Sequence, residues 1–288
     1  MRELRARTAL VTGASHGIGT HIARALAAEQ MQLVLAARSE AELEALAEQL
    51  RQAGCRVLVV PTDVGDRAAL EALVEAAGRE WGGVDLLVNN AGTMPVGAYH
   101  RFEAGELERF LQVNFASPLL LTRMVLPGML AQGRGHIVNI ASLAGKVAVA
   151  DLDPYCAIKA GLTHLTAALR ASYRGSGVSA SAVCPGFVRE TGVYHQVQQD
   201  TGVQTPLLLG SSPPGKVAAA VVRAVKRDQP EVLVNPLPVR PVLALQALFP
   251  ALTERIWPLA GTDLFQKASR VYERRGSTGS PTSAPETS

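Results

Sequence analysis

Short apolar runs alternate along the chain with longer stretches whose apolar positions recur at helical spacing. The runs predict strands at Thr8–Thr12, Gln32–Ala37, Arg56–Pro61, Asp85–Asn89, His136–Ala141, Val178–Cys184 and Glu231–Val234. The stretches between them predict helices at Ile18–Glu29, Glu40–Ala53, Arg67–Trp81, Glu103–Ala131, Pro154–Arg174 and Pro214–Lys226. Several strands are almost continuous in Val, Leu and Ile, which is typical of strands buried on both faces. The alternation therefore predicts an α/β fold: a doubly wound parallel sheet of about seven strands with helices on both faces.

Three parts of the chain follow from this pattern. The first, 1–235, is the α/β domain, and it includes a long connection over 187–214 of the kind that often forms a functional lid. The second, 236–275, is an apolar stretch interrupted by prolines, which predicts a helical extension. The third, 276–288, consists mainly of Ser, Thr, Pro and Gly and is expected to be disordered.

Composition narrows the class of protein. Apolar residues make up 48% of the 288 residues, and the net charge of +3 is too small to indicate a nucleic-acid partner. The three cysteines, Cys55, Cys156 and Cys184, form no Cys-x-x-Cys motif, which argues against a disulfide scaffold or a metal site and suits a reducing compartment. The N-terminus has no long apolar signal segment, so we expect a cytoplasmic protein.

A glycine-rich turn follows the first predicted strand. It contains Gly13, Gly17 and Gly19, and a helix is predicted to begin at Ile18. Such a turn lets the backbone approach a pyrophosphate, while the helix N-terminus supplies free N–H groups and partial positive charge. The turn predicts a dinucleotide site.

The end of the second strand bears on which dinucleotide binds. A site for a free ribose 2′-hydroxyl has Asp or Glu there, whereas this chain has Arg38. A guanidinium binds phosphate bidentately, and His16 offers a second contact. The sequence therefore favours NADP(H) over NAD(H). The alternative is that Arg38 is an ordinary surface arginine.

Tyr155 and Lys159 are spaced to share one face of a predicted helix. An ammonium beside a phenol favours the phenolate and lowers the tyrosine pKa toward working pH. Tyr155 is therefore a candidate general acid and base.

Residues 7–235 resemble the short-chain dehydrogenase/reductase family. The resemblance rests on the glycine turn, Asp63-Val64, the stretch Asn89–Gly92, Asn114 in mid-helix, Ser142 thirteen residues before Tyr155, and Pro185-Gly186. It implies a Rossmann-type domain and an NAD(P)-dependent oxidoreductase. The cofactor-binding residues it implies are Gly13, Ser15, His16, Gly17, Ile18, Gly19, Arg38, Asp63, Val64, Asn90, Ala91, Gly92, Tyr155, Lys159, Pro185, Gly186, Val188 and Thr191.

The resemblance also implies catalytic roles. Tyr155 would donate a proton to a carbonyl oxygen as hydride arrives. Lys159 would bond the nicotinamide ribose, and Ser142 would hold the substrate oxygen. Asn114 would anchor a water that links Lys159 to solvent; the alternative is a polar kink in its helix. One departure concerns Thr191, because the family usually has threonine one position earlier, where this chain has Glu190.

The substrate pocket is expected among Met94–Tyr99, Leu143–Asp153 and the 187–214 connection. Its candidate residues are Met94, Leu143, Leu152, Phe187 and Tyr194. This apolar lining suits a hydrophobic ketone, aldehyde or secondary alcohol. Two alternatives remain open: an NADPH-binding redox-sensing or regulatory protein, and an NAD(H)-dependent alcohol dehydrogenase of the same fold.

The role of the extension and the oligomeric state complete the expectations. Residues 240–275 would either make a peripheral membrane contact or pack over the substrate mouth or an oligomer interface. By resemblance, the chain forms a homodimer or homotetramer through the helices at Glu103–Ala131 and Pro154–Arg174.

Overall fold

A computed structural model describes residues 3–206, 209–256 and 263–275. The tail over 276–288, expected to be disordered, lies outside these residues.

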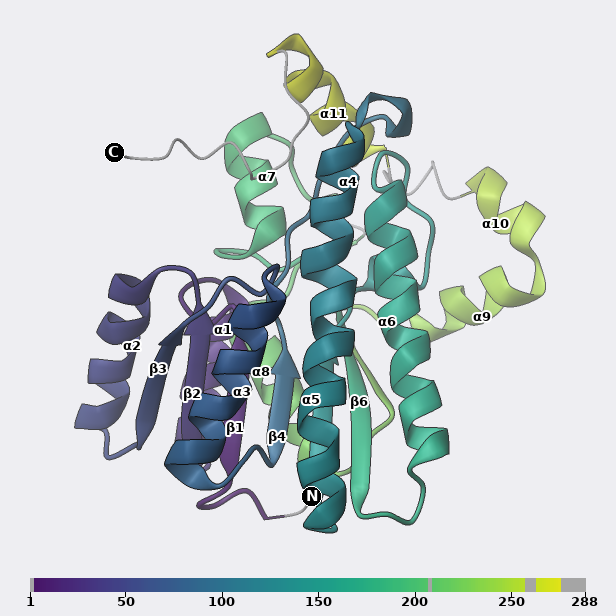
Figure 1. Cartoon of the computed structure of the whole chain (residues 1–288). Coiled ribbons are helices and arrows are strands. Elements are labelled where there is room, and N and C mark those ends of the chain that lie inside the picture. Colours follow the sequence, from purple (N-terminus) through teal and green to yellow (C-terminus); the bar gives the residue numbers. More distant parts are fainter. Residues whose placement is uncertain (1–2, 207–208, 257–262, 276–288) are drawn as a thin grey trace.

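The described residues contain a seven-stranded parallel sheet (Figure 1). Its spatial order is β3 (Val57–Pro61), β2 (Gln32–Ala37), β1 (Thr8–Thr12), β4 (Leu86–Asn89), β5 (Gly135–Ile140), β6 (Val178–Pro185) and β7 (Glu231–Val234). The chain winds outward from β1 in one direction through β2 and then in the other from β4. Ligands of such sheets bind at this switch point, outside the carboxyl ends of the strands. The predicted fold class is confirmed, and the predicted strand ends differ by one residue at most.

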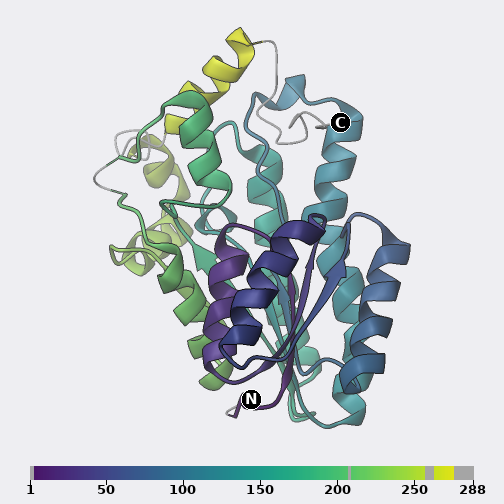
Figure 2. The same ribbon diagram turned by 90° about the vertical axis from the view of Figure 1, so that its left-hand side faces the viewer.

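Helices cover both faces of the sheet (Figures 1 and 2). One face carries α1 (Ile18–Ala28), α2 (Glu40–Gln52) and α8 (Pro214–Lys226), and the other carries α3 (Arg67–Trp81), α5 (Ser117–Ala131) and α6 (Asp153–Ser172). Side chains of β1 alternate between the two layers. Val11 joins the core beside α1, whereas Leu10 joins the core beside α3 and α5. Both faces of this strand are therefore dry, as its apolar sequence predicts.

The single helix expected over Glu103–Ala131 is interrupted. The structure has α4 (Ala104–Leu111), a π-helical turn η2 (Gln112–Ala116) and then α5. The side-chain amide of Asn114 donates to the carbonyl oxygen of Phe110 at 3.1 Å. Such turns are frequent at functional sites. By length and composition, Ala104–Ala131 is also the one helical run in the described residues that could cross a bilayer, but its α5 part packs against β4 and β5.

The 187–214 connection and the extension add four helices outside the two layers that cover the sheet. They are α7 (Val193–Thr201), α9 (Arg240–Leu248), α10 (Pro250–Ile256) and α11 (Leu264–Arg274). α11 packs against α7 (Figure 1), while α9 and α10 form a hairpin that projects from the body. Two short elements complete the fold, the 3₁₀ turns η1 (Tyr99–Arg101) and η3 (Leu143–Gly145).

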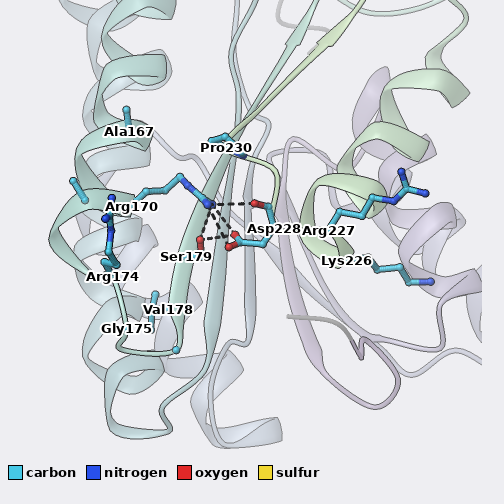
Figure 3. A pocket seen from close by; sticks show the side chains of 12 residues that line it. Ala167, Arg170, Arg174, Gly175, Val178, Ser179, Lys226, Arg227, Asp228 and Pro230 are labelled. Atoms are coloured by element: carbon cyan, nitrogen blue, oxygen red, sulfur yellow. Dashed lines mark hydrogen bonds and ion pairs between the residues drawn. The ribbon is translucent and has the colours of Figure 1, made fainter.

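A cavity of about 930 Å³ lies at the amino-terminal edge of the sheet, opposite the edge at which ligands of such sheets bind (Figure 3). Arg170, near the end of α6, crosses it to Asp228, which lies between α8 and β7, with a nitrogen–oxygen distance of 2.6 Å. The same guanidinium donates to Ser179 and to the carbonyl of Ala180. These contacts of Arg170 with Asp228, Ser179 and Ala180, called the Arg170 clasp below, join α6 to β6 and to the loop before β7.

Candidate active site

The glycine turn is fastened to the neighbouring strand at the switch point. The side-chain amide of Asn90 donates to the carbonyl oxygens of Thr12 at 2.9 Å and Gly13 at 3.1 Å. The backbone N–H groups of Asn90 and Ala91 donate to the hydroxyl of Thr12. Asn90, predicted from the family resemblance to bind cofactor, therefore also holds the shape of the turn.

The beginning of α1 is open to the large cavity above the sheet. Its N-cap is Gly17, at φ 66°, and neither a capping side chain nor an acidic residue satisfies its first N–H groups. Gly19 differs from the other predicted residues of this turn because it is buried and does not line the cavity. A Cβ on Gly19 would lie 2.0 Å from the carbonyl oxygen of Gly13, so this position serves close packing of the turn against α1. Free N–H groups at a helix N-terminus fit a pyrophosphate.

The adenosine end of the cavity carries more charge than the sequence suggested. Arg38 is exposed there, and His16 lies with its Nδ1 2.9 Å from the hydroxyl of Ser15. Asp63, expected to meet the adenine amino group, is held by Arg109 at 2.6 and 2.9 Å. Burial acts to raise the pKa of Asp63, but the hydrogen bonds from Arg109 and Gly65 outweigh it and lower the pKa. Sequence reasoning missed Arg109 because it comes from α4, far along the chain.

Three predicted catalytic side chains meet between α6 and the end of β5. Tyr155 and Ser142 line the same part of the cavity, and the Ser142 hydroxyl donates to the carbonyl oxygen of Pro185 at 3.4 Å. Lys159 donates to the carbonyl oxygen of Ile140 at 2.9 Å, and its Nζ lies 5.5 Å from the centre of the Tyr155 ring. Both Tyr155 and Lys159 are buried. The spacing on one helical face thus places the phenol and the ammonium together, as predicted.

The prediction that Lys159 lowers the pKa of Tyr155 toward neutral pH is wrong. Burial raises the pKa of Tyr155 to about 12, and the neighbouring Ser142 side chain opposes the rise without overcoming it. Burial also lowers the pKa of Lys159 to about 8. Desolvation disfavours the charged form of both groups, so Tyr155 holds its proton at neutral pH.

Asn114 lies in the π-helical turn and lines the same cavity. Its side-chain oxygen accepts the backbone N–H of Thr93 at 3.1 Å, and its amide donates to the Thr93 hydroxyl at 3.2 Å. The sequence left two alternatives for Asn114, a site residue and a polar kink in its helix, and the structure shows it both lining the cavity and lying in the irregular turn. The water-anchoring role stays a prediction.

The substrate half of the cavity is roofed by aromatic side chains. The rings of Phe187 and Tyr194 lie 4.5 Å apart, and Phe265 of α11 lies 6.0 Å from Tyr194. Tyr272 of α11 donates to the carboxylate of Asp200 on α7 at 3.1 Å. These α11 residues were missed individually, although a cover over the substrate mouth was among the expected roles of the extension.

Nearly all predicted site residues share one cavity of about 1,710 Å³. Those lining it are Gly13, Ser15, His16, Gly17, Ile18, Arg38, Asp63, Val64, Asn90, Ala91, Gly92, Met94, Asn114, Ser142, Leu143, Leu152, Tyr155, Lys159, Pro185, Gly186, Phe187, Val188, Thr191 and Tyr194. Glu190, one residue before Thr191, is exposed and pairs with Arg189 at 2.8 Å. The described residues hold no group of His, Cys, Asp and Glu placed to bind a metal ion, and all three cysteines are free.

Residues 7–202 match the family model for short chain dehydrogenase. The ketoacyl reductase HetN of Nostoc sp. is 41% identical over 282 residues, which cover 96% of this chain and 97% of that protein. The chain is a short-chain dehydrogenase/reductase. It is accordingly an NAD(P)-dependent oxidoreductase, and the free donors at the start of α1 fit such a cofactor.

Other similar proteins extend the comparison for this dehydrogenase. A putative ketoacyl reductase of the granaticin polyketide synthase of Streptomyces violaceoruber is 43% identical over 193 residues, 66% of this chain and 71% of that protein. A short-chain dehydrogenase of Burkholderia phymatum in complex with NAD has a TM-score of 0.78 at 30% identity, covering 88% of this chain and 97% of its own. A variant of the actinorhodin polyketide ketoreductase with NADPH has a TM-score of 0.73 at 33% identity, covering 82% and 98%.

Proposed function

We propose that this dehydrogenase uses NADPH to reduce a ketone carried on an apolar chain, such as a ketoacyl group, with Tyr155 as the proton donor. The observation that carries the proposal is the meeting of Tyr155, Ser142 and Lys159 inside one cavity that continues from an apolar, aromatic half to the glycine turn. An aldehyde or, in the reverse direction, a secondary alcohol would use the same groups.

A bound reduced nicotinamide supplies the hydride that reaches the carbonyl carbon. Tyr155 gives its proton to the carbonyl oxygen, and the burial that raises its pKa keeps that proton in place until negative charge develops. Ser142 donates a hydrogen bond to the same oxygen. The cation of Lys159, fixed against the carbonyl of Ile140, stabilises the phenolate that Tyr155 becomes.

Two observations support the substrate class. Met94, Leu152, Phe187, Tyr194 and Phe265 give the far half of the cavity an apolar lining. Two of the similar proteins are named ketoacyl reductases, from Nostoc and Streptomyces.

Replacing Tyr155 tests the proton donor. We expect Tyr155→Phe to lower kcat about 100-fold or more, since it removes the proton donor, while the Kd for NADPH stays nearly unchanged. The assay follows NADPH consumption with a ketoacyl thioester and with simple apolar ketones. Tyr99→Phe is the matched control, because Tyr99 is 59% exposed. Turnover retained in Tyr155→Phe would mean that another group is the acid.

The preference for NADPH is proposed from Arg38. We expect Arg38→Ala to raise the KM and Kd for NADPH about tenfold or more by removing a charge-assisted contact to the 2′-phosphate. The values for NADH should change little. Arg24→Ala on α1 is the control, because Arg24 bonds Gln49 instead. Equal changes for both cofactors in Arg38→Ala would exclude this role.

We also propose that copies of the chain pair through α4, α5 and α6 in the cytoplasm. Leu111, Leu119 and Leu130 are 37–48% exposed on α4 and α5, which supports a contact there. The regulatory alternative gains no support from a specific observation, because the chain retains both Tyr155 and Lys159.

A further inference from the structure

The exposed apolar side chains of this protein are concentrated in one place. Ten large apolar residues are exposed in the described residues, and six of them are Leu237, Val242, Leu245, Leu248, Phe249 and Leu252. Leu248 is 72% exposed and Phe249 56%. They belong to the α9–α10 hairpin and to the segment leading into it, on the flank where the hairpin projects (Figures 1 and 2). Such a concentration of exposed large apolar residues indicates an interaction surface.

The α9–α10 hairpin buries few of its own side chains. No residue of α9 is buried. In α10, Thr253 is the one residue among those whose burial is described that is buried. The two helices contact each other, but this contact and the rest of the described chain leave their large apolar side chains exposed.

Positive charge accompanies these exposed apolar residues. Arg240 and Arg255 are exposed near the two ends of the hairpin, and neither forms an ion pair with another described residue. Residues 237–256 contain these two arginines and one acidic residue, Glu254, so the segment carries a net charge of +1. Exposed large apolar residues flanked by arginines fit an interface with anionic lipid.

We propose that the α9–α10 hairpin docks the protein on the surface of an anionic lipid bilayer. The helices, of nine and seven residues, are far too short to span, so the contact is peripheral. A second copy fits less well, because a two-fold contact sets a patch against itself and would bring the arginines of both copies together. The exposed leucines of α4 and α5 offer a separate surface for self-association.

The base of the hairpin also reaches the catalytic cavity. Val239, Val242 and Leu243 line the cavity that contains Tyr155. Docking would therefore bring the cavity mouth to the lipid surface, so that an apolar ketone dissolved in the bilayer could enter without crossing water. This last step rests on the proposed function; the docking itself does not.

Vesicle flotation tests the docking with the full chain. The probes are phosphatidylcholine vesicles with and without phosphatidylglycerol. We expect the wild type to float with the anionic vesicles, and the double variant Leu248→Gln/Phe249→Gln to bind at least about tenfold more weakly. Neither residue lines the cavity. The matched control is Tyr99→Gln, whose side chain is 59% exposed in η1.

A second pair of variants tests the charge. Arg240→Gln/Arg255→Gln should bind the anionic vesicles more weakly and lose much of the salt dependence of binding. Arg67→Gln/Arg79→Gln is the control, because both arginines lie exposed on α3 and pair with glutamates.

Three outcomes would overturn the proposal: no flotation of the wild type, equal flotation of the Leu248→Gln/Phe249→Gln variant, or a vesicle-free oligomer, measured by light scattering, that this variant dissociates. Reduction of a ketoacyl thioester by NADPH is measured in the same preparations, with and without vesicles. Activity without flotation would refute the docking alone, and flotation without activity would refute the proposed function alone.

Discussion

At the scale of single residues, the site combines a phenol that keeps its proton with a lysine that is close to losing its own. The pKa of Tyr155 is raised to about 12 and that of Lys159 is lowered to about 8, both chiefly by burial. At neutral pH the tyrosine is therefore a loaded acid, and the lysine is still a cation. The arrangement favours reduction of a carbonyl over removal of a proton from an alcohol.

This pair predicts the pH profile of the reduction. Lys159 is charged below a pH of about 8 and becomes neutral above it, so kcat/KM should fall as pH rises through about 8. Tyr155 stays protonated throughout this range and adds no second transition. The measurement is initial-rate NADPH oxidation at saturating cofactor between pH 6 and 10. A profile that stays flat across pH 8 would show that the charge of Lys159 is not required.

The candidate site could be predicted well where chemistry is encoded in short motifs. Tyr155, Lys159, Ser142 and the glycine turn lie within one cavity because each motif sits at the end of a strand or on one helical face. Arg109 and Phe265 could not be predicted, since their contacts depend on how distant helices pack. The pKa of Tyr155 was predicted in the wrong direction because the sequence shows a neighbouring cation but not the depth of burial.

At the scale of elements, α6 is anchored at both ends. Tyr155 lies in its first turn, and Arg170, near its last, reaches Ser179, Ala180 and Asp228 (Figure 3). The clasp sets the position of α6 against β6 and the approach to β7.

Removing this clasp should destabilise the protein measurably. We expect Arg170→Met to lower the free energy of unfolding by about 1–3 kcal/mol, because charge-assisted hydrogen bonds to two elements are lost while half of the Asp228 side chain stays solvent-exposed. Urea unfolding measures the change. Arg174→Met, on the same helix near the same cavity, is the control and should change stability by less than about 0.5 kcal/mol. Equal effects of the two substitutions would rule out a specific clasp.

The elements also show what periodicity can and cannot predict. The buried strands can be predicted from nearly unbroken apolar runs, such as Gln32–Ala37. The π-helical turn at Gln112–Ala116 cannot be predicted from periodicity. It contains Asn114, whose side chain bonds Phe110 in the same helix and Thr93 outside it. Likewise, α7 has few buried residues and depends on α11 for its packing.

At the scale of the whole molecule, His136 makes folding sensitive to acid. It is fully buried in β5 with Nε2 2.8 Å from the hydroxyl of Ser181. Because Ser181 donates to the carbonyl of Gln229 at 2.6 Å, His136 must be the donor to Ser181. Its Nδ1 has no partner among the described residues, and burial lowers the pKa of His136 to about 3.

The consequence is a loss of stability as pH falls. Between about pH 6.5 and 3 the unfolded chain binds a proton at His136 that the folded chain does not, so the free energy of unfolding decreases with decreasing pH. From pH 6.5 to 5 the loss from this residue is about 2 kcal/mol. Urea unfolding at both pH values should show a smaller difference for His136→Gln, whatever its stability at pH 6.5. The exposed control His100→Gln should behave as the wild type; an unchanged difference in His136→Gln would exclude His136 as the cause.

Part of the cover over the substrate half of the cavity comes from the chain that follows the last strand, and the rest comes from Phe187 and Tyr194. Phe265 and Tyr272 of α11 complete a chamber whose floor carries Tyr155, yet they contribute nothing to the sheet or the glycine turn. Residues that shape the substrate pocket and residues that carry the proton transfer therefore lie in different segments of the chain. A chimera that exchanges residues 236–275 with those of a related reductase would change which molecules fit while leaving the proton donor and its supports intact.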